Sequence, residues 1–430
     1  MADVPIVVQG RLLPSIAPTN SSAARRLFSN SAAMAIANLA GRGLGYAYII
    51  LMARKLDPRY LGAYAVLVTT SLLIELISNL GLDKILVREI TKGTAEVGQG
   101  FFLAALPVRL AMAVPTAACA WLLLHAFFSQ RLFAPFWCVA LYLCAIFPVV
   151  AARNCEAFLT AHERLLPVAI SQACERVAVF LAVFALAFGQ LSFAGLLCII
   201  PVASFVRLLI VASSVSQLWS HNVRALRPSV RSFLKQAVEL LSVEILAMVY
   251  FRSDTFLVAR MDGLAITGIY QITYKIFDLC ISLFAGFLQA VFPRMVRDRS
   301  RASLLKILAF GVAVLLVPAG FIILARGLIL GSIHPEYIAG SKSLVWLMLT
   351  VPLVFTTSTL ANAAIAAGHV RILIVCAVGL IVTNVGMNMI LIPKYSINGA
   401  AFSTFACELL SVVLLGPFIF FKLGDSEGAA

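Results

Sequence analysis

Two stretches of this chain repeat each other. Residues 53–64 read Ala-Arg-Lys-Leu-Asp-Pro-Arg-Tyr-Leu-Gly-Ala-Tyr, and residues 259–270 read Ala-Arg-Met-Asp-Gly-Leu-Ala-Ile-Thr-Gly-Ile-Tyr. Their shared Ala-Arg, Gly and Tyr positions lie 206 residues apart. A second echo links 160–164 with 367–371, which share a His and an Arg at an offset of 207. Two matches at nearly one offset, close to half of the 430 residues, predict a duplicated chain.

The composition places the chain among membrane proteins. Hydrophobic residues make up 62% of the sequence and charged residues 12%, whereas soluble domains average about 45–50% and 25%. The net charge of +14 suits cytoplasmic loops that face anionic lipid. The basic residues are scattered, so we expect no nucleic-acid partner. The nine cysteines have no zinc-type spacing, and we expect no metal, no cofactor and no catalytic residues.

Twelve apolar stretches are long enough to cross a bilayer as helices. They cover roughly 29–53, 60–82, 100–126, 133–152, 165–188, 191–216, 233–258, 264–291, 304–329, 343–366, 370–392 and 397–421. Each copy therefore contributes six helices. The sequence predicts an all-α integral membrane protein with twelve transmembrane helices in two six-helix lobes.

The connecting segments predict the orientation. With the N-terminus inside, the inner segments hold seventeen Lys and Arg residues and the outer segments eight, which favours both termini in the cytoplasm. Six spans per copy give the copies one orientation, so we expect a pseudo-two-fold axis along the membrane normal. The expected units are an N-terminal tail (1–28), an N-terminal lobe (29–217), a basic linker (218–232), a C-terminal lobe (233–422) and a C-terminal tail (423–430).

A motif near the C-terminus carries a family resemblance. Residues 384–401 read Asn-Val-Gly-Met-Asn-Met-Ile-Leu-Ile-Pro-Lys-Tyr-Ser-Ile-Asn-Gly-Ala-Ala, followed by Thr404 and Glu408. This pattern resembles that of the Wzx-type polysaccharide flippases, the lipid-linked oligosaccharide transporters of the MATE-like (MOP) superfamily. Residues 250–278, 43–64 and 79–90 are similar to other parts of that family.

The resemblance implies a function. It implies two six-helix lobes around a central cavity, and translocation of an undecaprenyl-pyrophosphate-linked O-antigen or exopolysaccharide unit by alternating access. It further implies the bacterial cytoplasmic (inner) membrane as the location and membrane lipid and the polyprenyl-linked glycan as partners. The polysaccharide polymerase and the chain-length machinery are the expected protein partners.

Charged residues inside the predicted spans are the candidate site. A charge at mid-bilayer costs roughly 2.5–3.5 kcal/mol on insertion scales, so it needs a partner or a wet cavity. Guanidinium groups bind phosphate oxygens bidentately, which suits an anionic pyrophosphate. The candidate substrate-binding residues are Arg42, Arg252, Arg109, Arg207 and Lys275, and the candidate coupling or structural charges are Glu75, Asp254, Asp278 and Glu408.

Pairing among these charges is the competing interpretation. Lys275 and Asp278 are three residues apart and can meet on one helix face. Asn384 and Asn388 are one turn apart, and hydrogen bonding between helices is their expected role.

Two other functions stay open. A cation-coupled multidrug exporter of the MATE family would need an acidic residue facing the first lobe's cavity; the first span has none, although Glu75 and Glu175 follow. A polyprenyl-sugar-dependent membrane glycosyltransferase or ligase would need carboxylates or His in a sizeable outer loop. The outer connections are short and offer Asp57, Asp262, His334 and Glu336. No GxxxxGK[ST] motif occurs, so no P-loop supplies energy.

Overall fold

The computed structural model describes residues 7–8, 11–12, 40–128, 132–219, 230–298, 300–367 and 369–427. Within these ranges the chain is helical apart from its turns and one pair of two-residue strands, β1 (Val7–Val8) and β2 (Arg11–Leu12). The expected N-terminal tail and the linker over 218–232 fall mostly outside the described residues. The helix α14 continues to Glu427 and so includes part of the expected C-terminal tail.

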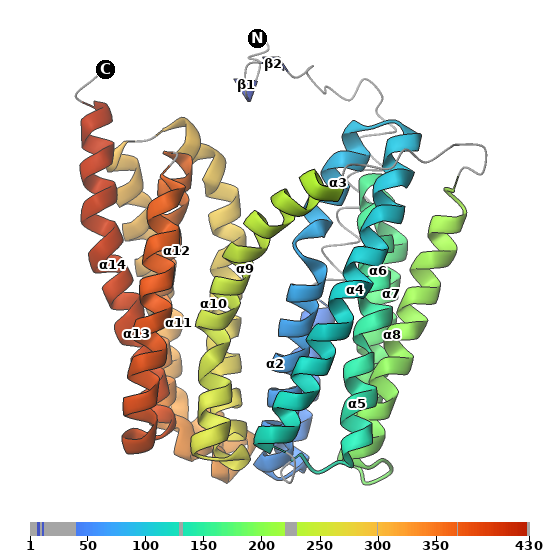
Figure 1. Ribbon diagram of the computed structural model, residues 1–430. Helices are drawn as coiled ribbons and strands as arrows, with labels where there is room; N and C mark the ends of the chain where they lie inside the picture. The colour runs from blue at the N-terminus through green and yellow to red at the C-terminus, as the bar shows by residue number, and fades with distance from the viewer. Residues whose placement is uncertain are drawn as a thin grey trace.

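The first half of the chain forms one bundle and the second half forms another, side by side (Figure 1). The first bundle contains a helix over 40–55, α2 (Pro58–Asn79), α3 (Leu82–Lys92), α4 (Ala95–Phe128), α5 (Phe136–Cys144), α6 (Ile146–Ala161), α7 (Leu165–Ala187) and α8 (Phe193–Ser216). The second contains α9 (Val230–Met261), α10 (Leu264–Arg297), α11 (Arg301–Ile333), the 3₁₀ helix η1 (Pro335–Gly340), α12 (Ser341–Ala366), α13 (Val370–Tyr395) and α14 (Ile397–Glu427). We call these bundles the N-lobe and the C-lobe.

The twelve predicted spans correspond to twelve long helical segments among the described residues. The helices α5 and α6 together form one of these segments. Ten described segments are long and apolar enough to cross a membrane. Two of the twelve helical segments are not among these ten. They are the first helix, which is described only over 40–55, and α9, which carries several charged residues. The prediction of an all-α membrane protein with two six-helix lobes is therefore confirmed.

The helix is interrupted at two places in the N-lobe, and nearby residues explain each interruption. Pro148 lacks the N–H that would bond the carbonyl of residue 144, and the helix is interrupted there between α5 and α6. The α2 helix ends at Leu80 and Gly81, both in the left-handed region with φ of 52° and 65°. This turn starts α3, a short amphipathic helix that buries Leu82 and Leu86 against the N-lobe.

The two lobes meet where α2 crosses α10. A Cβ atom added to Gly62 would strike the carbonyl oxygen of Leu264, and one added to Gly268 would strike that of Pro58. Only glycine permits such a close approach of two helix backbones. Arg54 also reaches the C-lobe here, donating to the carbonyl oxygen of Ser332 at 3.1 Å. We call this end of the molecule the closed end.

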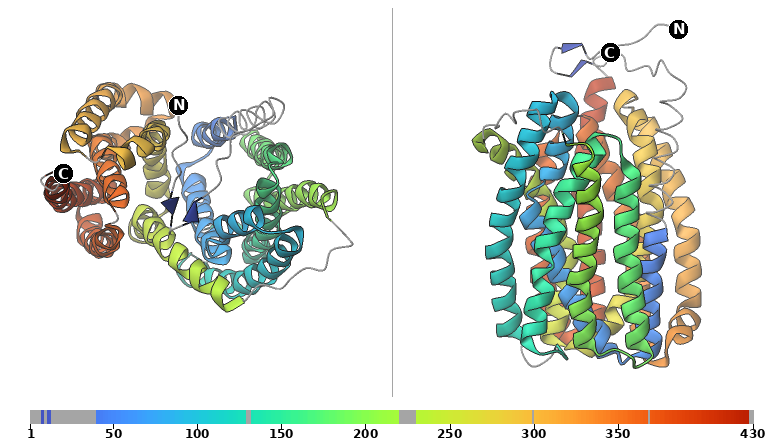
Figure 2. Two further views of the ribbon diagram at one scale, coloured as in Figure 1. Left: turned by 90° about the horizontal axis from the view of Figure 1, so that it is seen from above. Right: turned by 90° about the vertical axis from the view of Figure 1, so that its right-hand side faces the viewer.

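The opposite end holds α3 and the last turns of α14, and there the lobes stand apart (Figure 1). Seen along the helices, the two lobes curve around a central space (Figure 2). The upper half of α9 leans toward α3, so the first helix of the C-lobe reaches across to the N-lobe (Figure 1). The central space is therefore bordered by α2 and α3 on one side and by α9 and α10 on the other.

Candidate substrate cavity between the lobes

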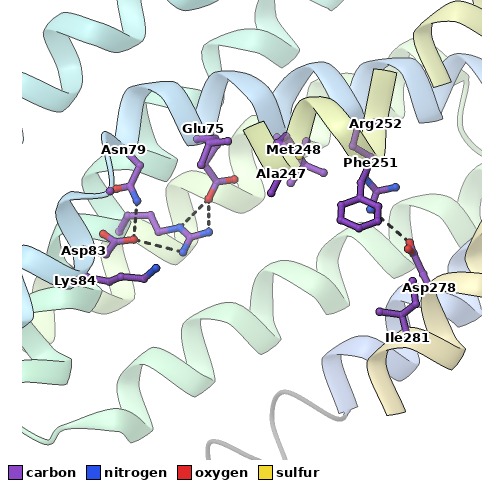
Figure 3. Close-up of a pocket in the computed structure, with 14 residues that line it drawn as sticks. Glu75, Asn79, Asp83, Lys84, Ala247, Met248, Phe251, Arg252, Asp278 and Ile281 are labelled. Carbon is purple, nitrogen blue, oxygen red and sulfur yellow. Dashed lines mark hydrogen bonds and ion pairs between the residues drawn. The ribbon is translucent and has the colours of Figure 1, made fainter. Parts of the chain in front are cut away.

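A cavity of about 650 Å³ lies between the lobes. Its polar lining residues are Glu75, Asn79, Asp83, Lys84 and Arg153 from the N-lobe and Arg252 and Asp278 from the C-lobe. The two groups of labelled side chains face each other across the space (Figure 3). Its apolar lining includes Leu72, Met248, Phe251 and Ile281. This volume lies within the range of about 300–1,000 Å³ typical of small-molecule sites.

The N-lobe wall is a network of paired charges. The Arg153 Nε atom donates to the Glu75 carboxylate at 2.7 Å, and its guanidinium also lies 3.7 Å from Asp83. Asn79 donates to Asp83 at 2.8 Å, and so does Arg109. The two guanidinium groups and the two carboxylates of this network balance, and Lys84 adds a further cation to the same wall.

The C-lobe wall places two cations beside one carboxylate of the cavity lining. The same Oδ2 atom of Asp278 lies 3.4 Å from the Arg252 guanidinium and 3.3 Å from the Lys275 ammonium. The Lys275–Asp278 pair is the one predicted from their spacing, and it is confirmed. Arg252 also lies over the ring of Tyr274, 5.4 Å from its centroid. Arg252 also interacts electrostatically with the buried Asp254. Arg252 is the cation of this wall that lines the cavity, so it is the group that can bind an anion there.

The structure places Arg109 away from the cavity. Its side chain is fully buried in α4 and is ion-paired with Asp83, and it is not among the cavity's lining residues. Its Nε and Nη1 atoms have no hydrogen-bond partner among the described residues. The carboxylate that pairs with Arg109 lies 26 residues away in the chain, beyond the spacing that places two side chains on one helix face.

The structure also places Arg207 inside the N-lobe. Its guanidinium forms a bidentate pair with Glu156 at 2.7 and 3.0 Å and a further pair with Glu175 at 2.8 Å. Ser204 and Gln172 complete the coordination of the two carboxylates. This network borders a separate cavity of about 170 Å³ within the N-lobe. Its position supports packing of α6, α7 and α8 and does not bring Arg207 into the inter-lobe cavity.

Arg42 is exposed on the first helix, and within the described ranges no carboxylate pairs with it. Tyr46, one turn further along, interacts electrostatically with both Arg42 and Asp278. Arg42 is not among the lining residues of the inter-lobe cavity. Of the candidate substrate-binding residues, four are therefore paired with carboxylates: Arg109, Arg207, Arg252 and Lys275. Arg42 has no carboxylate partner among the described residues.

The remaining acidic candidates lie in the C-lobe interior. Asp254 is buried and accepts a 2.6 Å hydrogen bond from the Tyr270 hydroxyl. Glu408 is buried and accepts one from the Tyr250 hydroxyl at 2.9 Å, which links α9 to α14. Asn388 donates to Asn384 at 3.0 Å. Among the residues with described side chains, no group of three or more His, Cys, Asp or Glu is arranged to hold a metal ion.

Arg153 and Asp83 are cavity residues that the sequence reasoning placed in connecting segments. The apolar run ends at residue 152, but α6 continues to Ala161. Hydropathy falls at Arg153 because the residue is charged, although its side chain pairs with carboxylates of the same lobe. The sequence does contain a sign that the helix continues past residue 152. Arg153 and Glu156 are three residues apart, which is a helical spacing of opposite charges.

Known proteins show where this architecture recurs. The family described as "Polysaccharide biosynthesis protein" matches residues 27–298, while no curated protein matches the chain. Among solved structures, the lipid II flippase MurJ in an inward closed conformation is similar at a TM-score of 0.74 and 14% identity, covering 91% of this chain and 89% of that one. An inward-facing multidrug resistance MATE transporter of the MOP superfamily has a TM-score of 0.74 and 13% identity, covering 90% and 96%.

A mutant of the Vibrio cholerae MATE transporter VcmN has a TM-score of 0.57 at 14% identity, covering 94% and 98%. At these identities the structures show a shared fold, and the family match covers more than half of the chain. The chain thus belongs to the polysaccharide biosynthesis protein family, and it has the fold of the MOP superfamily transporters.

Proposed function

We propose that this protein is a flippase that moves a polyprenyl-pyrophosphate-linked oligosaccharide across the bacterial cytoplasmic membrane, and that it acts as a transporter rather than an enzyme. The observation that carries the proposal is the C-lobe wall, where Arg252 and Lys275 share the one carboxylate of Asp278 beside a cavity of about 650 Å³. A pyrophosphate is an anion that the Arg252 guanidinium, at the surface of this cavity, can bind bidentately. The family match and the MurJ fold support the same function.

The mechanism is alternating access. The anionic headgroup enters between the lobes at the end that holds α3, which we assign to the cytoplasm from the charge of the inner segments. Arg252 binds the phosphates, and Arg42, which has no carboxylate partner among the described residues, adds a second cation. The lobes then rock about the α2–α10 crossing, and the headgroup is released on the other side while the polyprenyl chain stays in lipid. The polysaccharide polymerase and the chain-length machinery would receive the product.

The experiment is deletion of the protein in its native cell. Lipid-linked sugar units should accumulate on the cytoplasmic face, and the parent protein should restore export. Arg252→Ala should fail to restore export when its amount of folded protein in the membrane equals that of the parent. Normal export after deletion would overturn the proposed function. Full rescue by Arg252→Ala together with Arg42→Ala would overturn the cationic site and leave the export function standing.

Drug export is a second candidate because three carboxylates line the cavity: Glu75, Asp83 and Asp278. They could attract a cationic drug, and MATE transporters share the fold. Each of these carboxylates, however, is paired with a cation of its own lobe. Drug susceptibility of the deletion strain separates the two functions, because a flippase mutant should lose surface glycan without becoming sensitive to organic cations.

A further inference from the structure

A second, mostly apolar cavity of about 460 Å³ lies at the seam between the lobes. We call it the seam groove. Its walls come from α2 (Leu73, Ile77), α4 (Leu123, Phe127) and α9 (Phe256, Arg260). Leu123 and Phe127 are about half exposed, at 52% and 51%, so the groove faces the surrounding membrane. Its walls belong to both lobes, so its shape must change when the lobes move.

Arg260 is the one charged residue of the seam groove. Its guanidinium lies over the Phe127 ring, 5.9 Å from the centroid, and it has no carboxylate partner in the part of the chain that the structure describes. The nearest carboxylate on its own chain segment, Asp262, accepts a 2.7 Å hydrogen bond from Ser396. The threonine hydroxyls of the groove, on Thr70 and Thr116, donate to the backbone of their own helices. Arg260 is therefore available to an anion.

The α9 helix connects the two cavities. Arg252 lines the inter-lobe cavity, and Arg260 follows eight residues later in the seam groove, with Phe256 between them. Eight residues of helix rise about 12 Å. Arg260 lies near the closed end because α9 ends at Met261 next to the start of α10. Eight residues also turn the helix about 80° beyond two full turns, so Arg260 faces the seam groove while Arg252 faces the inter-lobe cavity.

We propose that the seam groove is the exit site of the flippase, where the polyprenyl chain lies against the apolar walls and its phosphate binds Arg260. This inference rests on the proposed function, and it names the site that takes the lipid after translocation. An apolar groove with a single unpaired guanidinium at one end complements an amphiphile with a long hydrocarbon chain and an anionic head. Continuity with Arg252 along α9 favours the transported lipid over a bulk phospholipid.

The test measures lipid binding to the purified full-length protein by native mass spectrometry. The probes are undecaprenyl phosphate, which carries no sugar, and phosphatidylglycerol. The variants are Arg260→Ala, which removes the cation, and Leu123→Trp, which fills the groove from an exposed position. The matched control is Arg326→Ala, an exposed arginine of α11 outside the groove whose side chain bonds the carbonyl of Ile323.

Arg260→Ala and Leu123→Trp should each weaken binding of undecaprenyl phosphate at least about tenfold, the effect of losing a charge-assisted contact. Arg326→Ala should leave it unchanged, and phosphatidylglycerol should not displace the probe. Unchanged binding in both groove variants would overturn the proposal, and so would equal displacement by phosphatidylglycerol, which would indicate a phospholipid site.

Export assays separate this inference from the proposed function. If Arg252→Ala abolishes export while both groove variants bind lipid and export like the parent, the exit site is wrong and the flippase function stands. If deletion of the protein leaves export intact, the function itself is wrong. Should Arg260→Ala fold poorly, Leu123→Trp and Arg260→Lys carry the test, because Lys keeps the charge and should retain part of the binding.

Discussion

Gly62 and Gly268 are equivalent residues of the two sequence copies, and they face each other where α2 crosses α10. The neighbours that crowd them are equivalent too, because Pro58 and Leu264 are separated by the same 206 residues as the two glycines. Contacts of this reciprocal kind are a property of two-fold symmetric interfaces. The repeated segment therefore lies at the pseudo-two-fold axis and joins the lobes there.

Replacing Gly62 or Gly268 by Leu should destabilise the protein, because the added side chain has no space beside the opposing backbone. Overpacking of this kind costs about 1–3 kcal/mol. Thermal unfolding of the purified protein in detergent measures the effect. Gly286→Ala on the same α10 helix is the control, because nothing lies within 4 Å of a Cβ atom there. Equal melting temperatures for the Gly62 and Gly286 variants would contradict the close crossing.

Asp83→Asn should destabilise the fold more than it affects substrate binding. It leaves the fully buried Arg109 guanidinium without its carboxylate, and breaking a buried pair costs about 3–5 kcal/mol. Replacing both Asp83 and Arg109 by Leu should recover much of the loss, since no buried charge is then left unpaired. The measurement is the denaturation midpoint in detergent; a double variant no more stable than the single one would argue against the pairing.

Arg252→Ala should reduce export per folded molecule by at least about tenfold, because it removes a charge-assisted contact to phosphate. Arg252→Lys keeps the charge without the planar fork, so it should lose part of the activity. Arg42→Ala should behave like Arg252→Ala, because Arg42 has no carboxylate partner among the described residues. Arg326→Ala serves as the control for a surface arginine, and parental export in both cavity variants would refute the cationic site.

Cysteine labelling tests the orientation. In a variant without native cysteines, a cysteine at position 225 should be protected from an impermeant reagent applied outside, and one at position 336 should react. Position 336 lies in η1, between α11 and α12 at the closed end. The reasoning is the excess of Lys and Arg in the segments assigned to the inside. The reverse labelling pattern would invert the proposed direction of transport.

The sequence predicted the membrane-spanning helices because hydropathy indicates whether a segment can lie in lipid. It predicted the Lys275–Asp278 pair because three residues of helix place two side chains on one face. It predicted duplication from the repeated segment, but it gave no sign that the two copies of that segment touch each other at Gly62 and Gly268.

The partners of Arg109, Arg207 and Arg153 were not predictable in the same way. Their carboxylates lie 26 to 78 residues away in the chain. Periodicity indicates which residues share a helix face, but it does not say which helices become neighbours. The predicted fourth span also ended too early, at residue 152. Arg153 lowers the mean hydropathy of the segment because it is charged, even though it is paired inside the protein.

The shared carboxylate of Asp278 affects how long a substrate stays bound. When a phosphate takes Arg252, Asp278 keeps Lys275 at 3.3 Å, and Asp254 keeps the hydrogen bond from the Tyr270 hydroxyl. The substrate therefore enters and leaves without breaking up the wall, and the barrier to dissociation stays low. A carrier needs this property, since its turnover number is limited by release as much as by capture. The Arg153–Glu75 pair on the opposite wall would resist such an exchange. We therefore expect the substrate to bind and dissociate faster at the C-lobe wall than at the N-lobe wall.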